Sequence, residues 1–206
     1  IATADVSQDQ KTVTIEAHGG WLGHASAVSF PTWSSQNGQD DIRWYQATRS
    51  GDAWTATVQI ADHRSAGTYA VHVYGTMWGQ TYIASAISFT IDAPKASVSI
   101  TQSEDQKKSG SFSVLVEFPA DMKAAAPERV QVPVWSTVNG QDDIEWLDAR
   151  KLTSGAWQAD VTLIHPRRDV GEYQAHVYVT CVNRVFSFAG SCSAKVETTP
   201  VEIKAE

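Results

Sequence analysis

The hexapeptide NGQDDI occurs twice in this chain, as Asn37–Ile42 and again as Asn139–Ile144. The match extends on both sides, because FPTWSSQNGQDDIRW aligns with VPVWSTVNGQDDIEW and GTYAVHVY aligns with GEYQAHVY. The 206 residues therefore form a tandem repeat of a unit of roughly 100 residues, the size of one small domain. A unit of this length can bury its own core, unlike the short repeats of a solenoid. We expect one domain over residues 1–93 and a second over residues 96–206, joined at Ala93-Pro94-Lys95.

Short alternating runs such as KTVTIEA, AWTATVQI and AISFTI indicate β-strands. They are rich in β-branched and aromatic residues, and turn residues separate them at intervals of about 8–12 positions. Each repeat offers about seven such runs, which is typical of a sandwich of two sheets. The predicted fold is therefore all-β, with two tandem immunoglobulin/fibronectin-III-like β-sandwich domains of about seven strands each.

The run GTYAVHVY predicts which side chains face the core. Its Gly-x-Tyr entry is typical of the tyrosine corner of immunoglobulin-like domains. If Tyr69 packs inward, Val71 and Val73 follow it, and His72 and Tyr74 face outward. The second repeat gives the same assignment, with Tyr173, Ala175 and Val177 inward and His176 and Tyr178 outward.

The neighbouring strands are assigned by the same alternation. Trp33 and Trp135 take the outward parity, and the prolines two residues before them predict a bulge or a sheet edge, since proline has no N–H. In the next strand we place Ile42 and Trp44 inward, which turns Arg43 and Tyr45 outward. The second repeat has Ile144 and Trp146 inward, with Glu145 and Leu147 outward.

Composition and charge exclude several classes of protein. Hydrophobic residues make up 42% of the chain and charged residues 19%, which indicates a globular protein. The net charge is −7 and no Lys/Arg block occurs, so nucleic acid and anionic membrane are not expected partners. No apolar run is long enough for membrane insertion. The chain begins at Ile1, and we expect it to be a piece of a longer protein.

The NGQDD motif has a structural and a functional interpretation. Asn-Gly favours a turn because both residues tolerate positive φ, and Asp side chains can accept backbone N–H groups there. The alternatives are polar recognition or a Ca²⁺ site, but adjacent carboxylates face opposite ways and Ca²⁺ needs six to eight oxygens. Glycoside hydrolysis needs two carboxyl groups that face each other, which adjacent residues do not provide, so we expect no enzyme activity. We also expect no metal and no cofactor. The motif residues that we assign to the scaffold are Asn37, Gly38, Gln39, Asp40 and Asp41, with Asn139, Gly140, Gln141, Asp142 and Asp143 in the second repeat.

Cys181 and Cys192 lie around the last hairpin of the second repeat, and the first repeat has neither. A hairpin loop could bring them together, whereas a tight turn near Asn183 would hold them too far apart to bond. A secreted setting favours the bond, and we expect a disulfide.

The pattern P-x-W-S-x-x-NGQDDI-x-W, followed by G-x-Y-x-x-H-V-Y, resembles the GBS Bsp-like repeat. That module occurs in tandem in surface and secreted proteins of Gram-positive bacteria, often beside peptidoglycan hydrolase domains. The resemblance covers nearly all of both repeats. It implies an extracellular, cell-wall-associated or secreted location, and it names no ligand. The second repeat departs from the pattern at Leu147, and HPRRD (His165–Asp169) replaces the Asp62-His63 turn.

We expect a monomeric, non-catalytic module that binds cell-wall polysaccharide, peptidoglycan or a host glycan. Sugar rings stack on aromatic faces, while His and Asp bond hydroxyl groups. The alternatives are a rigid spacer, or an adhesin stalk that binds protein through a sheet edge or face. Since Leu147 stands where the first repeat has Tyr45, we expect the first repeat to bind more tightly. The candidate ligand-binding residues are Trp33, Tyr45, His72, Tyr74, Trp135, His176 and Tyr178.

Overall fold

A computed structural model describes residues 1–36, 38–138, 140–163 and 170–199. The chain divides into two compact units. The first comprises Ile1–Ala93 with the short segments Lys123–Ala126 and Cys181–Ser187, and the second comprises the rest of the chain from Pro94 onward. The expected domain bounds, 1–93 and 96–206, stay a prediction. That each unit folds without the other stays a prediction. Asn37, Asn139 and the HPRRD segment lie outside the described residues.

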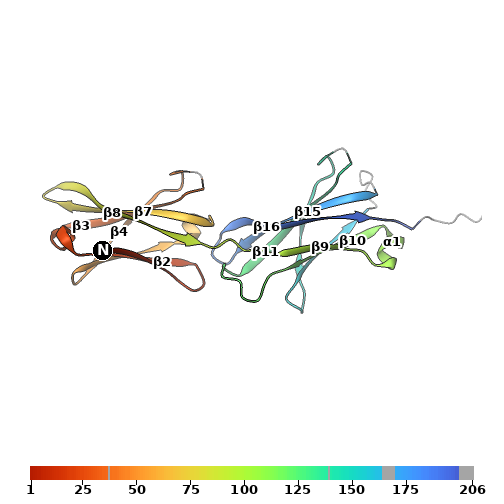
Figure 1. Ribbon diagram of the computed structural model, residues 1–206, viewed down its shortest axis with the longest axis horizontal. Coiled ribbons are helices and arrows are strands. Elements are labelled where there is room, and N and C mark those ends of the chain that lie inside the picture. The colour runs from red at the N-terminus through yellow and green to blue at the C-terminus, as the bar shows by residue number, and fades with distance from the viewer. Residues whose placement is uncertain (37, 139, 164–169, 200–206) are drawn as a thin grey trace, which may run out of the picture. The chain divides into compact units, whose positions relative to one another are not determined.

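The first unit is a sandwich of two antiparallel four-stranded sheets (Figure 1). The order in one sheet is β1-β2-β6-β5, made of Ala2–Val6, Thr12–His18, Ala53–Gln59 and Thr48–Ser50. The other sheet has the order β4-β3-β7-β8, made of Arg43–Gln46, Ala27–Ser34, Gly67–Met77 and Gln80–Ile91. Two 3-10 turns, Gly20–His24 and Ile60–Asp62, complete the unit.

The second unit repeats this topology strand for strand. Its sheets have the orders β13-β14-β10-β9 and β12-β11-β15-β16. The first sheet consists of Arg150–Lys151, Trp157–Thr162, Ser111–Glu117 and Ser97–Thr101. The second consists of Glu145–Asp148, Pro127–Ser136, Gly171–Cys181 and Phe186–Val196. The predicted all-β fold of two tandem sandwiches is thus confirmed. In each unit, two consecutive strands belong to different sheets, β4 and β5 in the first unit and β12 and β13 in the second.

That division occurs at one alanine in each unit. Ala47 separates β4 from β5, and its N–H donates to the carbonyl of Val28 at 2.9 Å. Ala149 separates β12 from β13 and donates to the carbonyl of Val130 at the same distance. A single run of chain therefore leaves one sheet and joins the other, as happens at the corners of many sandwiches.

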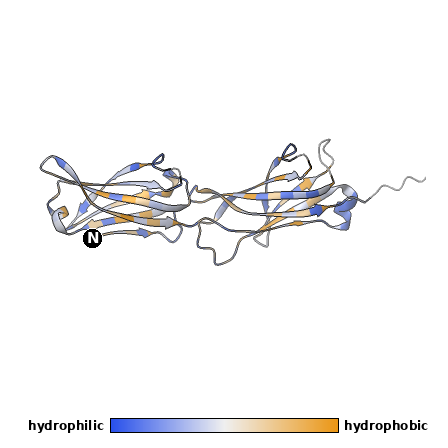
Figure 2. Ribbon diagram, turned by 45° about the horizontal axis from the view of Figure 1, so that its top comes forward, coloured by the Kyte–Doolittle hydropathy of each residue, from blue (hydrophilic) through white to orange (hydrophobic). Residues whose placement is uncertain are grey.

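The core lies between the sheets, where the inward half of each alternating strand meets. Figure 2 shows hydrophobic residues interspersed with hydrophilic ones along the strands. Tyr69, Val71 and Val73 are fully buried, and the hydroxyl of Tyr69 donates to the carbonyl of Ser65 at 2.7 Å. This bond is the predicted tyrosine corner. Other fully buried residues of the first unit include Val13, Ile15, Phe30, Val58, Ile60 and Ile91.

The proline-bearing strands are central rather than at an edge, contrary to one sequence-based expectation. β3 pairs with β4 on one side and with β7 on the other. Its pairing with β7 is interrupted between Ser29 and Thr32, yet the register on both sides of Pro31 is the same. The missing N–H therefore removes a rung of the ladder without inserting a bulge.

The one α-helix in the described residues, α1 (Glu104–Ser109), belongs to the second unit and was not predicted. Ser103 and Gln106 form a reciprocal capping box, in which each side chain accepts the other's backbone N–H. Gly110, in the left-handed region at φ 62°, ends the helix. The insertion that lengthens this connection relative to the first repeat is thus a capped helical turn.

The disulfide prediction is wrong, because Cys181 and Cys192 are both free. β15 and β16 are joined by a tight turn, in which the N–H of Arg184 donates to the carbonyl of Cys181 at 2.8 Å. Cys192 lies six positions beyond Phe186, the first residue of β16. At about 3.3 Å per residue, the strand separates the two cysteines by roughly 20 Å, well beyond disulfide reach.

Candidate functional site

The outward residues of the long hairpin strands lie on the face of the β4-β3-β7-β8 sheet that is turned away from the core. His72 and Tyr74 alternate on β7 with the buried Val71 and Val73, and both are half-buried. His176 and Tyr178 alternate on β15 with the buried Ala175 and Val177 in the same way. This part of the prediction is confirmed.

The prediction for the adjacent strand β4 is wrong in both its inward and outward assignments. Residues directly opposite in an antiparallel pair share a face of the sheet. Tyr45 lies opposite the fully buried Phe30, and so faces the core, whereas Trp44 lies opposite Pro31 and faces outward. The side chain of Trp44 is 55% exposed.

The second unit requires the same correction. Leu147 lies opposite the buried Val132, and Trp146, which is 51% exposed, lies opposite Pro133. Ile42 is half-buried and Ile144 exposed, so neither belongs to the core as predicted. Because position 147 faces the core, Leu147 removes no aromatic ring from the outer face. The reason for expecting weaker binding by the second repeat therefore fails.

Four residues of each unit form what we call its aromatic face. In the first unit the ring centroids of Trp33 and His72 are 4.8 Å apart with planes at 81°, and those of Trp44 and Tyr74 are 5.5 Å apart at 38°. His72 and Tyr74 link the two pairs, with centroids 6.0 Å apart. These separations and angles are typical of edge-to-face and tilted aromatic contacts. The aromatic face thus continues across β3, β4 and β7.

The second unit reproduces this geometry with Trp135, Trp146, His176 and Tyr178. The Trp135–His176 distance is 4.8 Å at 73°, and the Trp146–Tyr178 distance is 5.2 Å at 36°. Phe188 of β16 adds a ring that lies 5.4 Å from His176 and 5.7 Å from Tyr178. Its side chain is 48% exposed.

The tryptophans of each aromatic face differ in accessibility. Trp33 is half-buried and Trp135 is only 7% exposed. Both therefore mainly pack against the histidine ring of their face. Trp44 and Trp146 keep about half of their side-chain surface in solvent. A ligand that stacks on these faces would meet Trp44 or Trp146 first.

The described part of each NGQDD motif is a turn held by its second aspartate. Asp41 accepts the N–H of Ser34 at 2.9 Å, and Asp143 accepts the N–H of Ser136 at 3.0 Å. Gly38 and Gly140 adopt left-handed φ values of 70° and 80°. Because the two turns share these features, the predicted equivalence of the motifs extends to their described residues.

The first aspartate of each motif is arranged differently. Asp40 and Asp142 are exposed, and the described contacts include no hydrogen bond to either carboxylate. The expectation that both aspartates accept backbone N–H groups therefore holds for the second member of each pair alone.

A buried series of hydrogen bonds in the first unit was not predicted. The imidazole of His63 is 6% exposed and lies 3.1 Å from Asp41 through Nδ1 and 2.9 Å from the hydroxyl of Tyr45 through Nε2. Burial, reinforced by the carboxylate of Asp62, raises the pKa of Tyr45 to about 12. Leu147 cannot make the tyrosine contact in the second unit. These hydrogen bonds connect the first NGQDD turn to the core, and Tyr45 helps to hold His63 in place.

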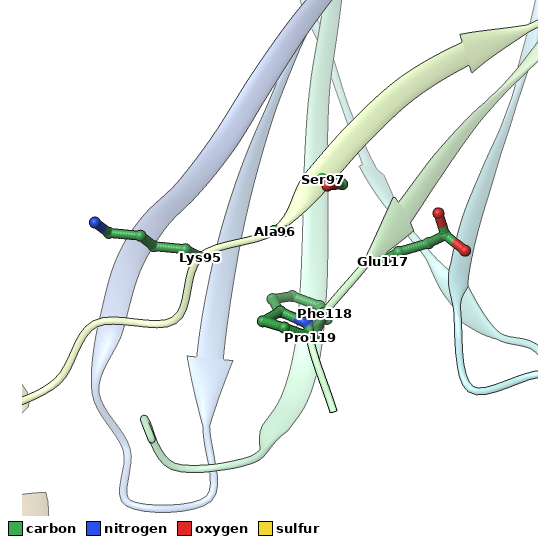
Figure 3. A pocket seen from close by; sticks show the side chains of 6 residues that line it. All are labelled: Lys95, Ala96, Ser97, Glu117, Phe118 and Pro119. Carbon is green, nitrogen blue, oxygen red and sulfur yellow. The ribbon is translucent and has the colours of Figure 1, made fainter. Parts of the chain in front are cut away.

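Hollows in the surface lie away from the aromatic faces. In Figure 3, Lys95 and Ala96 lead into β9, which begins at Ser97, and Phe118 and Pro119 follow Glu117, the last residue of β10. They line a hollow of about 370 Å³. Since β9 and β10 belong to the opposite sheet of the second unit, this hollow does not extend the aromatic face. Among the residues that the structure describes, no three His, Cys, Asp or Glu side chains are grouped so as to hold a metal ion. No described helix is long and apolar enough to cross a membrane.

Sequence reasoning missed Trp44, Trp146 and Phe188 as members of the outer faces. A signal for the first two was available, because tryptophan stands at this position in both repeats, while the next position changes from Tyr45 to Leu147. Phe188 has no such counterpart in the alignment, and its ring contacts alone place it.

Comparison with known proteins gives one match that covers both units. The model of the GBS Bsp-like repeat matches residues 2–87 and residues 101–194. No curated protein sequence matches the chain.

Among solved structures, a polysaccharide deacetylase from Bacillus cereus is similar over 49% of this chain and 30% of its own, at 13% identity and a TM-score of 0.40. A tetra-tandem repeat in the extending region of a large adhesion protein is similar over 94% of this chain and 47% of its own, at 12% identity and a TM-score of 0.40. The chicken interferon gamma receptor alpha chain is similar over 95% of this chain and 96% of its own, at 7% identity and a TM-score of 0.38. The chain spans less than half the length of the first two, and at these scores the matches carry no argument about function.

Proposed function

Because the chain belongs to the GBS Bsp-like repeat family, we propose that it is a non-catalytic tandem module of a bacterial surface or secreted protein that binds cell-wall glycan. The binding surfaces are the two aromatic faces. The module acts outside the cell, where it keeps the protein that carries it on the wall.

The observation that supports this proposal best is the repetition of one ring arrangement. The tryptophan–histidine pairs of the two units have the same centroid separation, 4.8 Å. The tryptophan–tyrosine pairs differ by only 0.3 Å, at 5.5 Å in the first unit and 5.2 Å in the second. Strand alternation turns these side chains away from the space between the sheets, and Trp44 and Trp146 keep about half of their surface in solvent.

The exposure of Trp44 and Trp146 favours binding over a purely mechanical role. An exposed tryptophan leaves a large apolar area in water, and a spacer would fold as well with threonine or serine on this face. Sugar rings present C–H faces that stack on such side chains, and this contact covers the apolar surface. The histidine and tyrosine of each face supply nitrogen and hydroxyl groups for hydrogen bonds to sugar hydroxyls.

The test is cosedimentation of the two-repeat chain with purified Gram-positive cell walls, using Trp44→Ala, Trp146→Ala and the double variant. Loss of one stacking partner, worth about 1 kcal/mol, should weaken binding about fivefold. The double variant should lose most of the bound fraction.

The matched control is Trp78→Asn, because Trp78 is 88% exposed between β7 and β8 but lies outside the aromatic face. Asparagine tolerates the φ of 52° at this position. Wall binding that is unaffected by the double variant, or absent from the unaltered chain, would refute the proposal and favour the spacer.

A further inference from the structure

We infer that the aromatic faces select an uncharged sugar chain and exclude phosphate-bearing polymers. This inference rests on the proposed function, because it concerns the ligand class of the same two faces. The residues that surround the rings, rather than the rings themselves, carry the argument.

Among the residues that the structure describes, the outer face of the first unit holds no Asp, Glu, Lys or Arg side chain. Strand register defines its members, because residues opposite an outward residue also face outward. None of these described positions is Asp, Glu, Lys or Arg. They are Ala27, Ser29, Pro31, Trp33, Trp44, Gln46, Thr68, Ala70, His72, Tyr74, Thr76, Thr81, Ile83, Ala86, Ser88 and Thr90.

The nearest arginine of this sheet is directed elsewhere. Arg43 lies opposite the buried Thr32, and its Nε donates to the carbonyl of Asp62 at 3.4 Å. It therefore belongs to the side of β4 that carries Tyr45, and it adds no cation to the aromatic face.

In the second unit, the described basic residues on the outward side of β11 and β16 each lie beside an acidic side chain. Arg129 donates from Nε and Nη2 to both carboxylate oxygens of Asp148, at 2.8 and 2.9 Å. Nζ of Lys195 lies 3.6 Å from Oε1 of Glu197. Glu172 alternates with His176 on β15 and adds a negative charge to the same side.

An anionic polymer would meet no unpaired cation on either face among these residues. Phosphate and carboxylate groups are bound in proteins chiefly by arginine, lysine or clustered N–H groups, and their desolvation is costly without such partners. The net charge of −7 also repels a polyanion. A neutral sugar chain has no such cost, and it can use the apolar rings that the faces do offer.

The experiment measures binding of the two-repeat chain to Gram-positive walls before and after hydrofluoric acid removes their phosphate-bearing polymers. Each measurement is made at about 0.1 M and about 1 M NaCl, between which the screening length falls from about 10 Å to about 3 Å. The inference predicts that stripped walls bind at least as well as native walls, and that the dissociation constant changes less than about twofold with salt.

A loss of binding on stripping, or a roughly tenfold weakening by salt, would overturn the inference. If that binding still required Trp44 and Trp146, the proposed function would stand and only the ligand class would be wrong. Binding to neither kind of wall would overturn the proposed function itself, and the inference with it.

A gain of charge provides a second test on the same chain. Ser88 is exposed and lies opposite Ala70 on the outer face, and Ala70 in turn lies opposite Trp33. Ser88→Lys should add salt-sensitive binding to native walls that disappears on stripped walls. Thr57→Lys, at an exposed position of the opposite sheet, is the matched control and should add none. Equal effects of the two variants would contradict the selection that we assign to this face.

Discussion

The carboxylate of Asp41 reaches the buried imidazole of His63, with Oδ2 and Nδ1 3.1 Å apart, while its other oxygen accepts the N–H of Ser34 at 2.9 Å. Asp143 repeats the backbone bond through Ser136 in the second unit. The recurrence of NGQDD is explained in part by this bond, since each unit needs an acceptor at the same place in its turn.

The two aspartates of the motif should differ in their effect on stability. Asp41→Ala leaves the N–H of Ser34 without its acceptor and His63 without its carboxylate, so we expect a loss of about 1.5–3 kcal/mol in the free energy of unfolding. Asp40→Ala, at an exposed position, should change it by less than about 0.5 kcal/mol. Urea unfolding of the intact chain measures both. Equal losses for the two variants would mean that the first aspartate also supports the turn.

The stability of the first unit should fall at alkaline pH. The phenol of an unfolded tyrosine ionises near pH 10, whereas burial raises the pKa of Tyr45 to about 12 in the folded chain. The folded state therefore holds this proton more tightly. Its contribution to stability is fully present below about pH 10 and is lost as the pH rises through about 12.

Tyr45→Phe is the variant that tests this pH dependence. Thermal unfolding between about pH 9 and about pH 12 should show a shallower decline than in the unaltered chain. The decline should not vanish, because burial also raises the pKa of Tyr69. Identical profiles would show that Tyr45 has no part in the alkaline loss.

Gly75 and Trp21 should behave as a coupled pair. A Cβ at position 75 would lie 2.6 Å from Cζ3 of Trp21, so Gly75→Val should overpack this contact and cost about 1–3 kcal/mol. The second repeat has Val179 at the aligned position, where it is fully buried. Trp21→Ala combined with Gly75→Val should therefore lose less stability than the two single losses added together. Additive losses in a double-mutant cycle would contradict the coupling.

Both thiols should remain reduced in the purified protein. Burial raises the pKa of Cys181 to about 11 and also raises that of Cys192, which makes both thiols poor nucleophiles in the folded chain. Alkylation of the unfolded chain without reductant should add two groups by mass spectrometry, one for each cysteine. A mass that shows no alkylation until a reductant is added would demonstrate a disulfide instead.

Strands with one unambiguous alternation were assigned correctly from sequence. In β7, the residues Tyr69, Val71 and Val73 form one apolar series, and polar or mixed positions fill the other. The glycine and tyrosine at its start also fix which series enters the core. His72 and Tyr74 were therefore placed outward without knowledge of any other strand.

Strand β4 resisted the same reasoning for a physical reason. Trp44 and Tyr45 are adjacent, so each face of the strand receives a large aromatic ring and alternation alone does not decide between them. The choice is made by pairing with β3, which places Tyr45 opposite Phe30. The position of His63 beneath Tyr45 depends on a contact between residues far apart in sequence, and the local pattern around His63 carries no sign of it.

The most direct test of glycan binding by the aromatic faces is the indole N–H spectrum of the two-repeat chain, titrated with solubilised wall glycan by NMR. Single tryptophan variants assign the eight indole signals. The account predicts that the signals of Trp44 and Trp146 shift with dissociation constants within about threefold of each other, because a difference of less than about 0.7 kcal/mol is expected between faces of matching geometry. The signals of Trp54 and Trp157, which are buried on the opposite sheets, and of Trp78 should stay in place. A titration that shifts the Trp78 signal alone, or leaves those of Trp44 and Trp146 unmoved at saturating glycan, would contradict the account.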